Sequence, residues 1–350
     1  MQNRWRKIAS LLVCLTLLAN IAGWLPTAEA ALISTKEEIE LGRRVANDLE
    51  RQYGLVGDVA LQDRVARIGA RIAAASERQD IQYSFKVLNS KEVNALALPG
   101  GYVYLFKGLV DYMPSDDELA GIIGHEVGHI SKRHTVRQIE KSLGVSILFG
   151  LVFGDRGVFL QNLVANAIMA GYSRADEREA DQLGYYHTTK AGYNPYSMLM
   201  GLQKLNDLER KGNYGLFSTH PEPEARVSLV QGYMNDSGVR PKVATPGNSS
   251  AQIADRELTL PPLTATYRGY RPFYRACFAA GALHLAAKAP DFSGDRFILD
   301  SDGTYITIYY DDREIITLTP QDATSAGLSL DGLSQRYIDA FKIWAATAKP

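Results

Sequence analysis

The feature that most constrains this chain is the pentapeptide His125-Glu126-Val127-Gly128-His129. On a helix, His125 and His129 lie one turn apart on the same face, so both imidazoles can bind one zinc ion. Glu126 projects beside them and can take a proton from zinc-bound water. The alternative, a surface helix with incidental histidines, is a poor explanation in a chain with only six histidines among 350 residues. The pentapeptide therefore predicts a zinc-dependent protease.

A third zinc ligand must come from elsewhere, because a catalytic zinc takes three protein ligands and keeps one open position. Glu177 and Asp181 are four residues apart on a predicted helix, so one could bind the metal while the other orients a ligand histidine. Glu179 points about 200° away from Glu177 and is expected to face solvent. His134 lies five residues past His129, off the ligand face, and is expected to support a ligand or the fold.

The elements around these residues follow from apolar spacing and breakers. Ser115 and Glu118 form a capping box that opens the helix of the pentapeptide. Pro99-Gly100-Gly101 separates two short strands. Helices are expected at 35–53, 58–78, 115–141, 173–191 and 195–211, and strands at 82–88, 93–98 and 102–106.

The first thirty residues have the layout of a secretory signal peptide. Arg4, Arg6 and Lys7 precede an apolar run from Ile8 to Leu25, and Ala28-Glu29-Ala30 is a small-x-small cleavage site. An uncleaved anchor is the alternative, since the run could nearly span a bilayer. Either way we expect export, to the periplasm or another extracytoplasmic space.

A second apolar segment, 143–170, is interrupted by Asp155-Arg156-Gly157. Neither half reaches the roughly 20 residues of a spanning helix. We expect a helical hairpin that is buried or contacts a membrane surface peripherally.

The C-terminal third differs in composition. Residues 236–262 are rich in Pro, Ser, Gly, Asn and Thr and predict a linker. Residues 263–350 predict a small α+β domain of unknown role, with strands at 296–299, 304–310 and 314–318, a hairpin turn at Asp311-Asp312 and a helix at 329–346. Cys277 lies in an apolar stretch and is expected to be a buried, inert thiol. Residues 31–235 would then form the peptidase domain.

The net charge of the chain is −1, and no basic patch is interleaved with aromatic residues. These features exclude nucleic acid as an expected partner.

Several motifs together resemble the zinc metallopeptidase family (gluzincins) that includes HtpX, the CAAX prenyl proteases and the periplasmic protease-chaperone BepA. The resemblance covers roughly residues 35–235. It implies an α+β fold, with a mainly helical zincin-type metalloprotease domain that contains a small antiparallel sheet. The stretches that carry it are Asn94-Ala95, Leu98-Pro99-Gly100-Gly101, Asp117-Glu118-Leu119-Ala120, the zinc pentapeptide, Arg133-His134, Ser173-Arg174 and Glu177-x-x-x-Asp181.

The resemblance also implies roles for residues. Glu177 would be the third ligand of one Zn²⁺ per chain, Asp181 the partner of a ligand histidine, and Arg174 and His134 supports of the site. The strand that ends in Leu98-Pro99-Gly100, with Asn94 and Ala95 at its start, would be the sheet edge on which an extended substrate lies. A free edge can bind a peptide backbone without reading its sequence.

Thr219-His220-Pro221 resembles a loop of soluble family members. His220 could donate to the substrate oxyanion, or it could cap the zinc as a fourth ligand and hold the enzyme latent. A third reading is a loop histidine bonded to a neighbouring carboxylate. The sequence leaves these readings open.

Two functions are consistent with these features. The first is a zinc endopeptidase that cleaves unfolded or misassembled envelope proteins in protein quality control. The second is a chaperone-like or assembly factor of the envelope, which grips such proteins with latent or no protease activity.

Overall fold

The computed structural model describes residues 33–150, 164, 166–167, 170–210, 220, 223–247, 249–256 and 258–347. The expected signal segment and most of the apolar segment 143–170 lie outside these residues. From Thr35 onward the chain packs as one compact unit. Among the described helices, none is both long enough and apolar enough to cross a bilayer.

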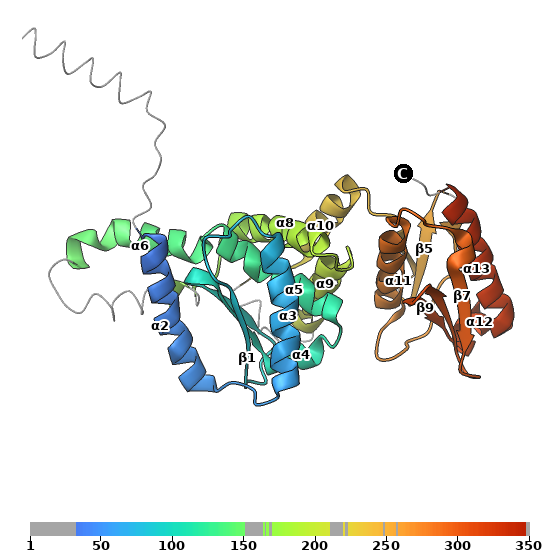
Figure 1. The fold of residues 1–350 in the computed structure, drawn as a ribbon, viewed down its shortest axis with the longest axis horizontal. Helices are drawn as coiled ribbons and strands as arrows, with labels where there is room; N and C mark the ends of the chain where they lie inside the picture. The colour runs from blue at the N-terminus through green and yellow to red at the C-terminus, as the bar shows by residue number, and fades with distance from the viewer. Residues whose placement is uncertain are drawn as a thin grey trace, which may run out of the picture. The chain divides into compact units, whose positions relative to one another are not determined.

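The N-terminal part begins with two helices and a small sheet at the expected places (Figure 1). In the sheet the strand order is β1-β3-β2. Strand β2 runs antiparallel to β3 as expected, whereas β1 pairs with β3 in parallel. Strand β2 is therefore an edge of this sheet. The elements are α2 (Thr35–Tyr53), α3 (Val59–Ala75), β1 (Ser84–Leu88), β2 (Ala95–Leu98), the single turn η1 (Pro99–Gly101) and β3 (Tyr102–Phe106).

The pentapeptide lies in α5 (Asp116–Ser131), which begins with the expected capping box and is almost wholly buried. Helix α8 (Arg174–Lys190), capped by Ser173, packs directly against it. Glycine permits this close approach: a Cβ on Gly128 would lie 2.6 Å from the carbonyl oxygen of Ala180. The acidic face of α8 is thereby brought against the histidine face of α5.

The expected single helix over 115–141 is wrong. Helix α5 ends at Ser131, and α6 (His134–Gly150) begins after a sharp turn. Arg133 forms this turn with a φ of 54°, in the left-handed region that residues other than glycine rarely adopt. Because neither Gly nor Pro stands there, the sequence gives no local signal of the break.

Three further helices are seen among the described residues of this part. Helix α9 (Ser197–Glu209) occupies the place expected for a helix at 195–211, whereas α4 (Lys107–Tyr112) and α10 (Pro223–Asp236) are additional. Helix α10 packs against both α8 and α9.

The segment predicted to be a linker contains a three-stranded antiparallel sheet instead. Its strands are short and half exposed, so their composition resembles that of a loop. The inward side chains of Ala251, Ile253 and Leu258 are nonetheless buried in the C-terminal core. The strands are β4 (Lys242–Gly247), β5 (Ser250–Asp255) and β6 (Leu258–Thr259).

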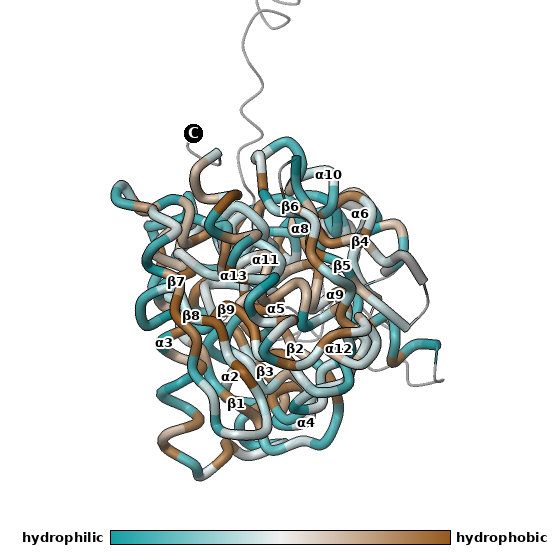
Figure 2. Tube along the Cα trace, turned by 90° about the vertical axis from the view of Figure 1, so that its right-hand side faces the viewer, coloured by the Kyte–Doolittle hydropathy of each residue, from teal (hydrophilic) through white to brown (hydrophobic). Residues whose placement is uncertain are grey.

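The remaining C-terminal elements agree with the expected α+β region. An antiparallel sheet of order β7-β8-β9 turns at Asp311 as predicted. Strand β8 is among the hydrophobic segments of the trace (Figure 2). Cys277 is buried and free, and burial raises the pKa of its thiol, as expected for an inert residue. The elements are α11 (Pro272–Ala287), the single turn η3 (Gly294–Arg296), β7 (Phe297–Ser301), β8 (Ile306–Tyr310), β9 (Arg313–Leu318), α12 (Pro320–Ser325) and α13 (Leu330–Thr347).

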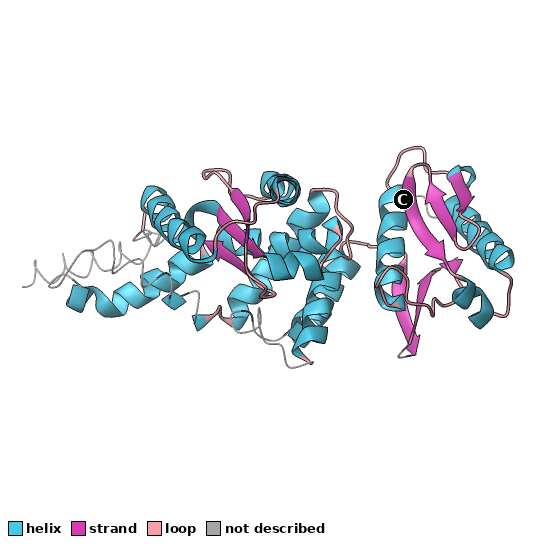
Figure 3. Cartoon of the chain, turned by 90° about the horizontal axis from the view of Figure 1, so that it is seen from below, coloured by secondary structure: helices cyan, strands magenta, loops and turns pink. Residues whose placement is uncertain are grey.

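Helices predominate and the strands form small separate sheets (Figure 3). The predicted fold class, a mainly helical α+β protein with a C-terminal α+β region, is confirmed. The predicted limits of the domains stay a prediction.

Candidate metal centre

Four buried side chains from three places in the chain converge on one point. They are His125 and His129 of α5, Glu177 of α8, and His220, and one ligand atom of each lies within 4.8 Å of the others. The Nε2 atoms of the two α5 histidines are 3.0 Å apart, and the Nδ1 atom of His220 is 3.1 Å from Nε2 of His125. The same Nδ1 atom is 2.8 Å from Oε1 of Glu177.

These distances fit a tetrahedral zinc ion. Ligand atoms about 2.0–2.1 Å from such an ion are about 3.3 Å from one another. Two further separations also lie near this value: Oε1 of Glu177 is 3.4 Å from Nε2 of His129, and Oε2 of Glu177 is 3.6 Å from Nε2 of His125. Three ring nitrogens and a carboxylate oxygen that point at one another are better satisfied by a cation than by shared protons. The donor set therefore fits one zinc ion.

The charges around the cluster also fit a dication. Glu126, Glu177 and Asp181 are buried carboxylates, and Arg226 is the buried guanidinium that faces them. Buried charges require compensation. If the three carboxylates are ionised, one guanidinium leaves two negative charges for a dication to balance.

Glu126 faces the cluster without a hydrogen bond to any described residue. Neither of its carboxylate oxygens has a hydrogen-bond partner among the described residues, although the side chain is fully buried. Its Oε1 atom is 3.8 Å from Nε2 of His220. Burial raises the pKa of Glu126. A buried carboxylate is costly unless it has a function or a missing partner, so Glu126 is a candidate general base.

Each α5 histidine has a partner for its other ring nitrogen. The Nδ1 atom of His125 is 2.9 Å from Oδ1 of Asp181, the partner that the resemblance implied. The Nδ1 atom of His129 is 2.8 Å from Nδ1 of His134. These contacts fix the rings with Nε2 toward the cluster. Burial, followed by the charge of His125, holds the pKa of His129 well below its usual value, so that its ring is neutral as a ligand must be.

Glu179 does not simply face solvent as expected. Its Oε2 atom accepts from Nε2 of His134 at 3.0 Å, and Lys132 and Arg137 also pair with it. With Nε2 of His134 as donor, Nδ1 of His134 accepts from the Nδ1–H of His129. The break at Arg133 makes this chain of contacts possible, because a continuous helix would turn His134 away.

Arg226 is a site residue that the sequence analysis missed. From α10 it donates to both carboxylate oxygens of Asp181, at 2.7 and 2.8 Å, and its Nη1 atom lies 2.6 Å from Glu177. Burial alone would raise the pKa of Glu177, but the charges of His220, Arg226 and His125 together hold it well below its usual value. The signal available in the sequence was an arginine six residues past His220, and that pattern alone is weak.

Tyr172 was also missed as a contact of the site. Its ring stacks on His129 with centroids 3.8 Å apart and an angle of 25°. Its hydroxyl lies 2.8 Å from that of Thr135, the residue after His134. Tyr172 precedes the N-cap of α8, so it packs the start of that helix against the ligand ring.

Comparison with known proteins agrees with this geometry. Residues 60–234, half of the chain, match the model of Peptidase family M48. The chain belongs to peptidase family M48. The predicted zinc metallopeptidase family is thereby confirmed. Residues 256–344 match a domain of unknown function, DUF8459.

The chain is similar to several proteases from bacteria and a plant. It is 27% identical over 261 residues to the beta-barrel assembly-enhancing protease of Escherichia coli K12, which covers 67% of this chain and 53% of that protein. It is 35% identical over 164 residues to the mitochondrial metalloendopeptidase OMA1 of Arabidopsis thaliana, covering 45% and 33%. With the E. coli metalloprotease YcaL it shares 26% over 219 residues, covering 60% and 82%. The chain spans about half the length of the assembly-enhancing proteases that it matches.

The remaining predicted site residues lie around strand β2 and at the start of α8. Ala95 and Leu98 begin and end the edge strand β2, Asn94 precedes it, and Pro99 and Gly100 form the turn that follows. Helix α5 packs against this strand. Arg174 is exposed at the first turn of α8, and its predicted role at the site stays a prediction.

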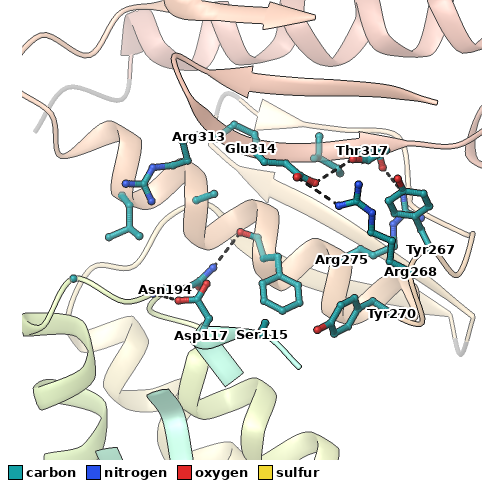
Figure 4. Close-up of a pocket in the computed structure, with 16 residues that line it drawn as sticks. Ser115, Asp117, Asn194, Tyr267, Arg268, Tyr270, Arg275, Arg313, Glu314 and Thr317 are labelled. Carbon is teal, nitrogen blue, oxygen red and sulfur yellow. Dashed lines mark hydrogen bonds and ion pairs between the residues drawn. The ribbon is translucent and has the colours of Figure 1, made fainter. Parts of the chain in front are cut away.

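A cavity of about 340 Å³ lies apart from the M48 ligand cluster (Figure 4). The residues that line it include Asp117, Asn194, Phe278 of α11, and Arg313 and Ile315 of β9. The side-chain amide of Asn194 donates to the carbonyl oxygen of Phe278, and the backbone amide of Asn194 donates to Asp117. None of the four ligand candidates lines this cavity, which separates it from the chemistry of the cluster.

Proposed function

We propose that this chain is an exported zinc-dependent endopeptidase that cleaves unfolded or misassembled proteins of the cell envelope. The observation that carries the proposal is the buried carboxylate of Glu126, which has no hydrogen bond to the described residues and lies beside four convergent ligand candidates. A site that only bound structural zinc would be closed by its ligands and would have no use for such a group.

In this proposal His125, His129 and Glu177 hold the zinc. When bound, the ion supplies a Lewis acid that polarises the scissile carbonyl and lowers the pKa of a water toward 7. Glu126 takes the proton from that water and passes it to the leaving amine. Asp181 and His134 hold the two ligand rings in orientation, and Arg226 holds Glu177 and Asp181.

His220 supports a latent state of the enzyme. Its Nδ1 atom lies between His125 and Glu177, at 3.1 and 2.8 Å, which is the fourth corner of the cluster. In that position it competes with water for the open coordination site. This geometry favours the cap over the oxyanion donor, because a donor to the substrate would lie beside the cluster rather than within it.

The edge strand β2 offers backbone groups for an extended peptide next to α5, a mode of binding that suits unfolded substrates of varied sequence. The printed name of the E. coli relative, an assembly-enhancing protease of beta-barrels, supports envelope proteins as substrates. The layout of residues 1–30 supports export to the periplasm. Membrane contact through residues 143–170 is a further part of the proposal.

The test compares wild type, Glu126→Gln and His220→Ala for cleavage of casein and of unfolded envelope proteins, with zinc content measured in each. We expect wild type to cleave, and Glu126→Gln to keep its zinc and lose cleavage by at least about 100-fold. Glu118→Gln is the control for loss of a carboxylate from the same helix, because Glu118 caps the helix start rather than facing the cluster. Full activity of Glu126→Gln would contradict the mechanism.

The second candidate, an envelope chaperone or assembly factor with latent or no protease activity, is favoured by the position of His220. If His220→Ala cleaves faster than wild type, the cap is supported. If His220→Ala loses activity, His220 supports the transition state instead. If no variant cleaves but the chain still binds unfolded proteins, the second candidate replaces the first.

A further inference from the structure

Glu38 of α2 is a buried carboxylate with four donors, far in sequence from the metal cluster. Only 1% of the residue is exposed. Arg78 donates to both of its oxygens at 2.8 Å, Arg133 donates to Oε2 at 2.8 Å, and the backbone amide of Gly100 donates to Oε1 at 3.0 Å. Two arginines therefore bind the carboxylate of Glu38, and Arg78 also pairs with Asp80 at 3.3 Å.

One set of these contacts fixes the end of the edge strand. Gly100 follows β2 with a φ of 76°, and its amide is held by Glu38. Helix α2 is packed so closely here that a Cβ on Gly42, one turn after Glu38, would lie 1.8 Å from the carbonyl oxygen of Pro99. The strand end that the proposed function assigns to substrate is therefore tied to α2 rather than to its own sheet alone.

The other set fixes the end of the metal-binding helix. Arg133 is the residue in the left-handed conformation between α5 and α6, and its side chain is anchored by Glu38. Arg78 uses its Nη1 atom to donate to the carbonyl oxygen of Ile130, in the last turn of α5, as well as to Glu38. The turn that these contacts hold places His134 against His129.

We propose that Glu38 is a positioning residue that fixes the distance between the substrate edge and the metal centre. One carboxylate holds Gly100 at the end of β2 and Arg133 at the end of α5, so a shift of either element is resisted by the other. The inference rests on the proposed function, because it takes β2 as the substrate edge. In this proposal α2 supplies no ligand, but it aligns the scissile bond with Glu126 and the zinc.

The experiment tests separately the contacts of Glu38 with the end of β2 and with the end of α5. Glu38→Gln removes the charge that holds both, Arg133→Gln releases the end of α5, and Gly42→Ala displaces the end of β2. Arg64→Gln is the matched control: Arg64 and Arg133 have the same 25% side-chain exposure and each pairs with a carboxylate, but Arg64 pairs with Asp116 at the start of α5.

Three readouts are measured for each variant: zinc affinity by competition with a chelator, cleavage positions in casein by mass spectrometry, and binding of a fluorescent unfolded peptide. Peptide binding is measured in the Glu126→Gln background, so that it does not depend on turnover. We expect Glu38→Gln to weaken zinc about tenfold or more, to weaken peptide binding, and to spread the cleavage positions. Arg133→Gln should affect zinc alone, and Gly42→Ala peptide binding and cleavage position alone.

The proposal is overturned if Glu38→Gln only lowers the melting temperature, with zinc affinity, peptide binding and cleavage positions like those of Arg64→Gln. If Glu38→Gln does not fold, the two partial variants decide. The proposal then fails if Arg133→Gln retains the wild-type zinc affinity, or if Gly42→Ala retains the wild-type peptide affinity. If the proposed function is wrong, wild type does not cleave. Zinc affinity and peptide binding still show whether Glu38 connects the end of β2 to the end of α5.

Discussion

The metal cluster and the C-terminal core each contain one deeply buried pair of an arginine and an aspartate. Arg226 binds both oxygens of Asp181, and Arg275 binds both oxygens of Asp322. In each pair both side chains are 5% exposed or less. The chemistry of the two pairs is the same, so their surroundings show what each pair does.

In the C-terminal core the pair has mainly backbone partners, and the hydroxyl of Thr319 in the α12 capping box also donates to Asp322. Asp322 also accepts from the backbone amides of Thr264 and Ala265, and Arg275 also donates to the carbonyl oxygens of Ala265 and Thr317. The pair therefore connects α11, β9 and α12. Its role is to hold the fold.

At the cluster the contacts of the pair lead to candidate metal ligands instead. Asp181 also bonds to His125, and Arg226 also reaches Glu177, both ligand candidates. Close by, Glu126 has no hydrogen-bond partner in the part of the chain that the structure describes. A buried ion pair therefore marks a candidate functional site when its remaining contacts lead to polar groups that lack hydrogen-bond partners.

The largest expected difference is between loss of the ligand candidate Glu177 at the cluster and loss of Asp322 in the C-terminal core. Glu177→Gln should lose its zinc and reduce cleavage at least about 100-fold, because it removes a ligand whose charge the ion balances. Asp322→Asn should keep one zinc per chain and lower only the free energy of unfolding. Zinc content and denaturant unfolding of both variants check this. Equal zinc content in the two would break the comparison.

Loss of the two arginines should separate stability from metal affinity. Arg275→Gln should cost about 3–5 kcal/mol of unfolding free energy, with or without zinc, because it leaves Asp322 buried without its charge partner. Arg226→Gln should weaken zinc binding about 10- to 100-fold, and its loss of stability should be larger after chelation than with zinc bound. Urea unfolding with and without a chelator measures both. A chelator-dependent loss in Arg275→Gln would contradict the distinction.

The partner of the second ligand histidine should have a smaller effect. His134→Gln should weaken zinc binding about tenfold, because His129 loses the acceptor that orients its ring. His187→Gln is the matched control, since His187 is also buried and its Nε2 atom is 2.7 Å from a carboxylate, that of Glu77, away from the cluster. Titration of zinc against a competing chelator checks the two variants. The same affinity loss in both would remove His134 from the site.

The smallest expected effect is a pH dependence of the C-terminal pair. Burial alone would raise the pKa of Asp322, but the hydrogen bond and charge of Arg275 hold it below its usual value. The stabilisation is therefore present above the pKa of an unfolded aspartate, about 3.9, and is lost as the pH falls below it. Thermal unfolding between pH 3 and 6 should show a steeper acid loss in wild type than in Arg275→Gln. Parallel curves would contradict this assignment.

Much of the site was predictable because its residues occur in pairs that are spaced by one helical turn. His125 and His129, and likewise Glu177 and Asp181, are four residues apart, so a helix alone brings each pair onto one face. What placed the two faces together was the close packing of α5 on α8 at Gly128. The sequence showed the glycine, but not which helix would pack there.

The parts that were not predictable depend on contacts between distant residues. The break at Arg133 is stabilised by Glu38, 95 residues away, and Arg226 reaches Asp181 across 45 residues. No local pattern contains such pairs. The strands β4–β6 were hidden for a different reason, since a half-exposed sheet has the polar composition of a loop.

We propose that His125, His129 and Glu177, with His220 in the fourth corner, hold one zinc ion. The most direct measurement is zinc content together with X-ray absorption at the zinc edge, on wild type and on His220→Ala. We expect one zinc per chain, with three nitrogen ligands in wild type and two in His220→Ala. A purified chain that binds no zinc, or a zinc whose ligands are the same in both proteins, would contradict the account.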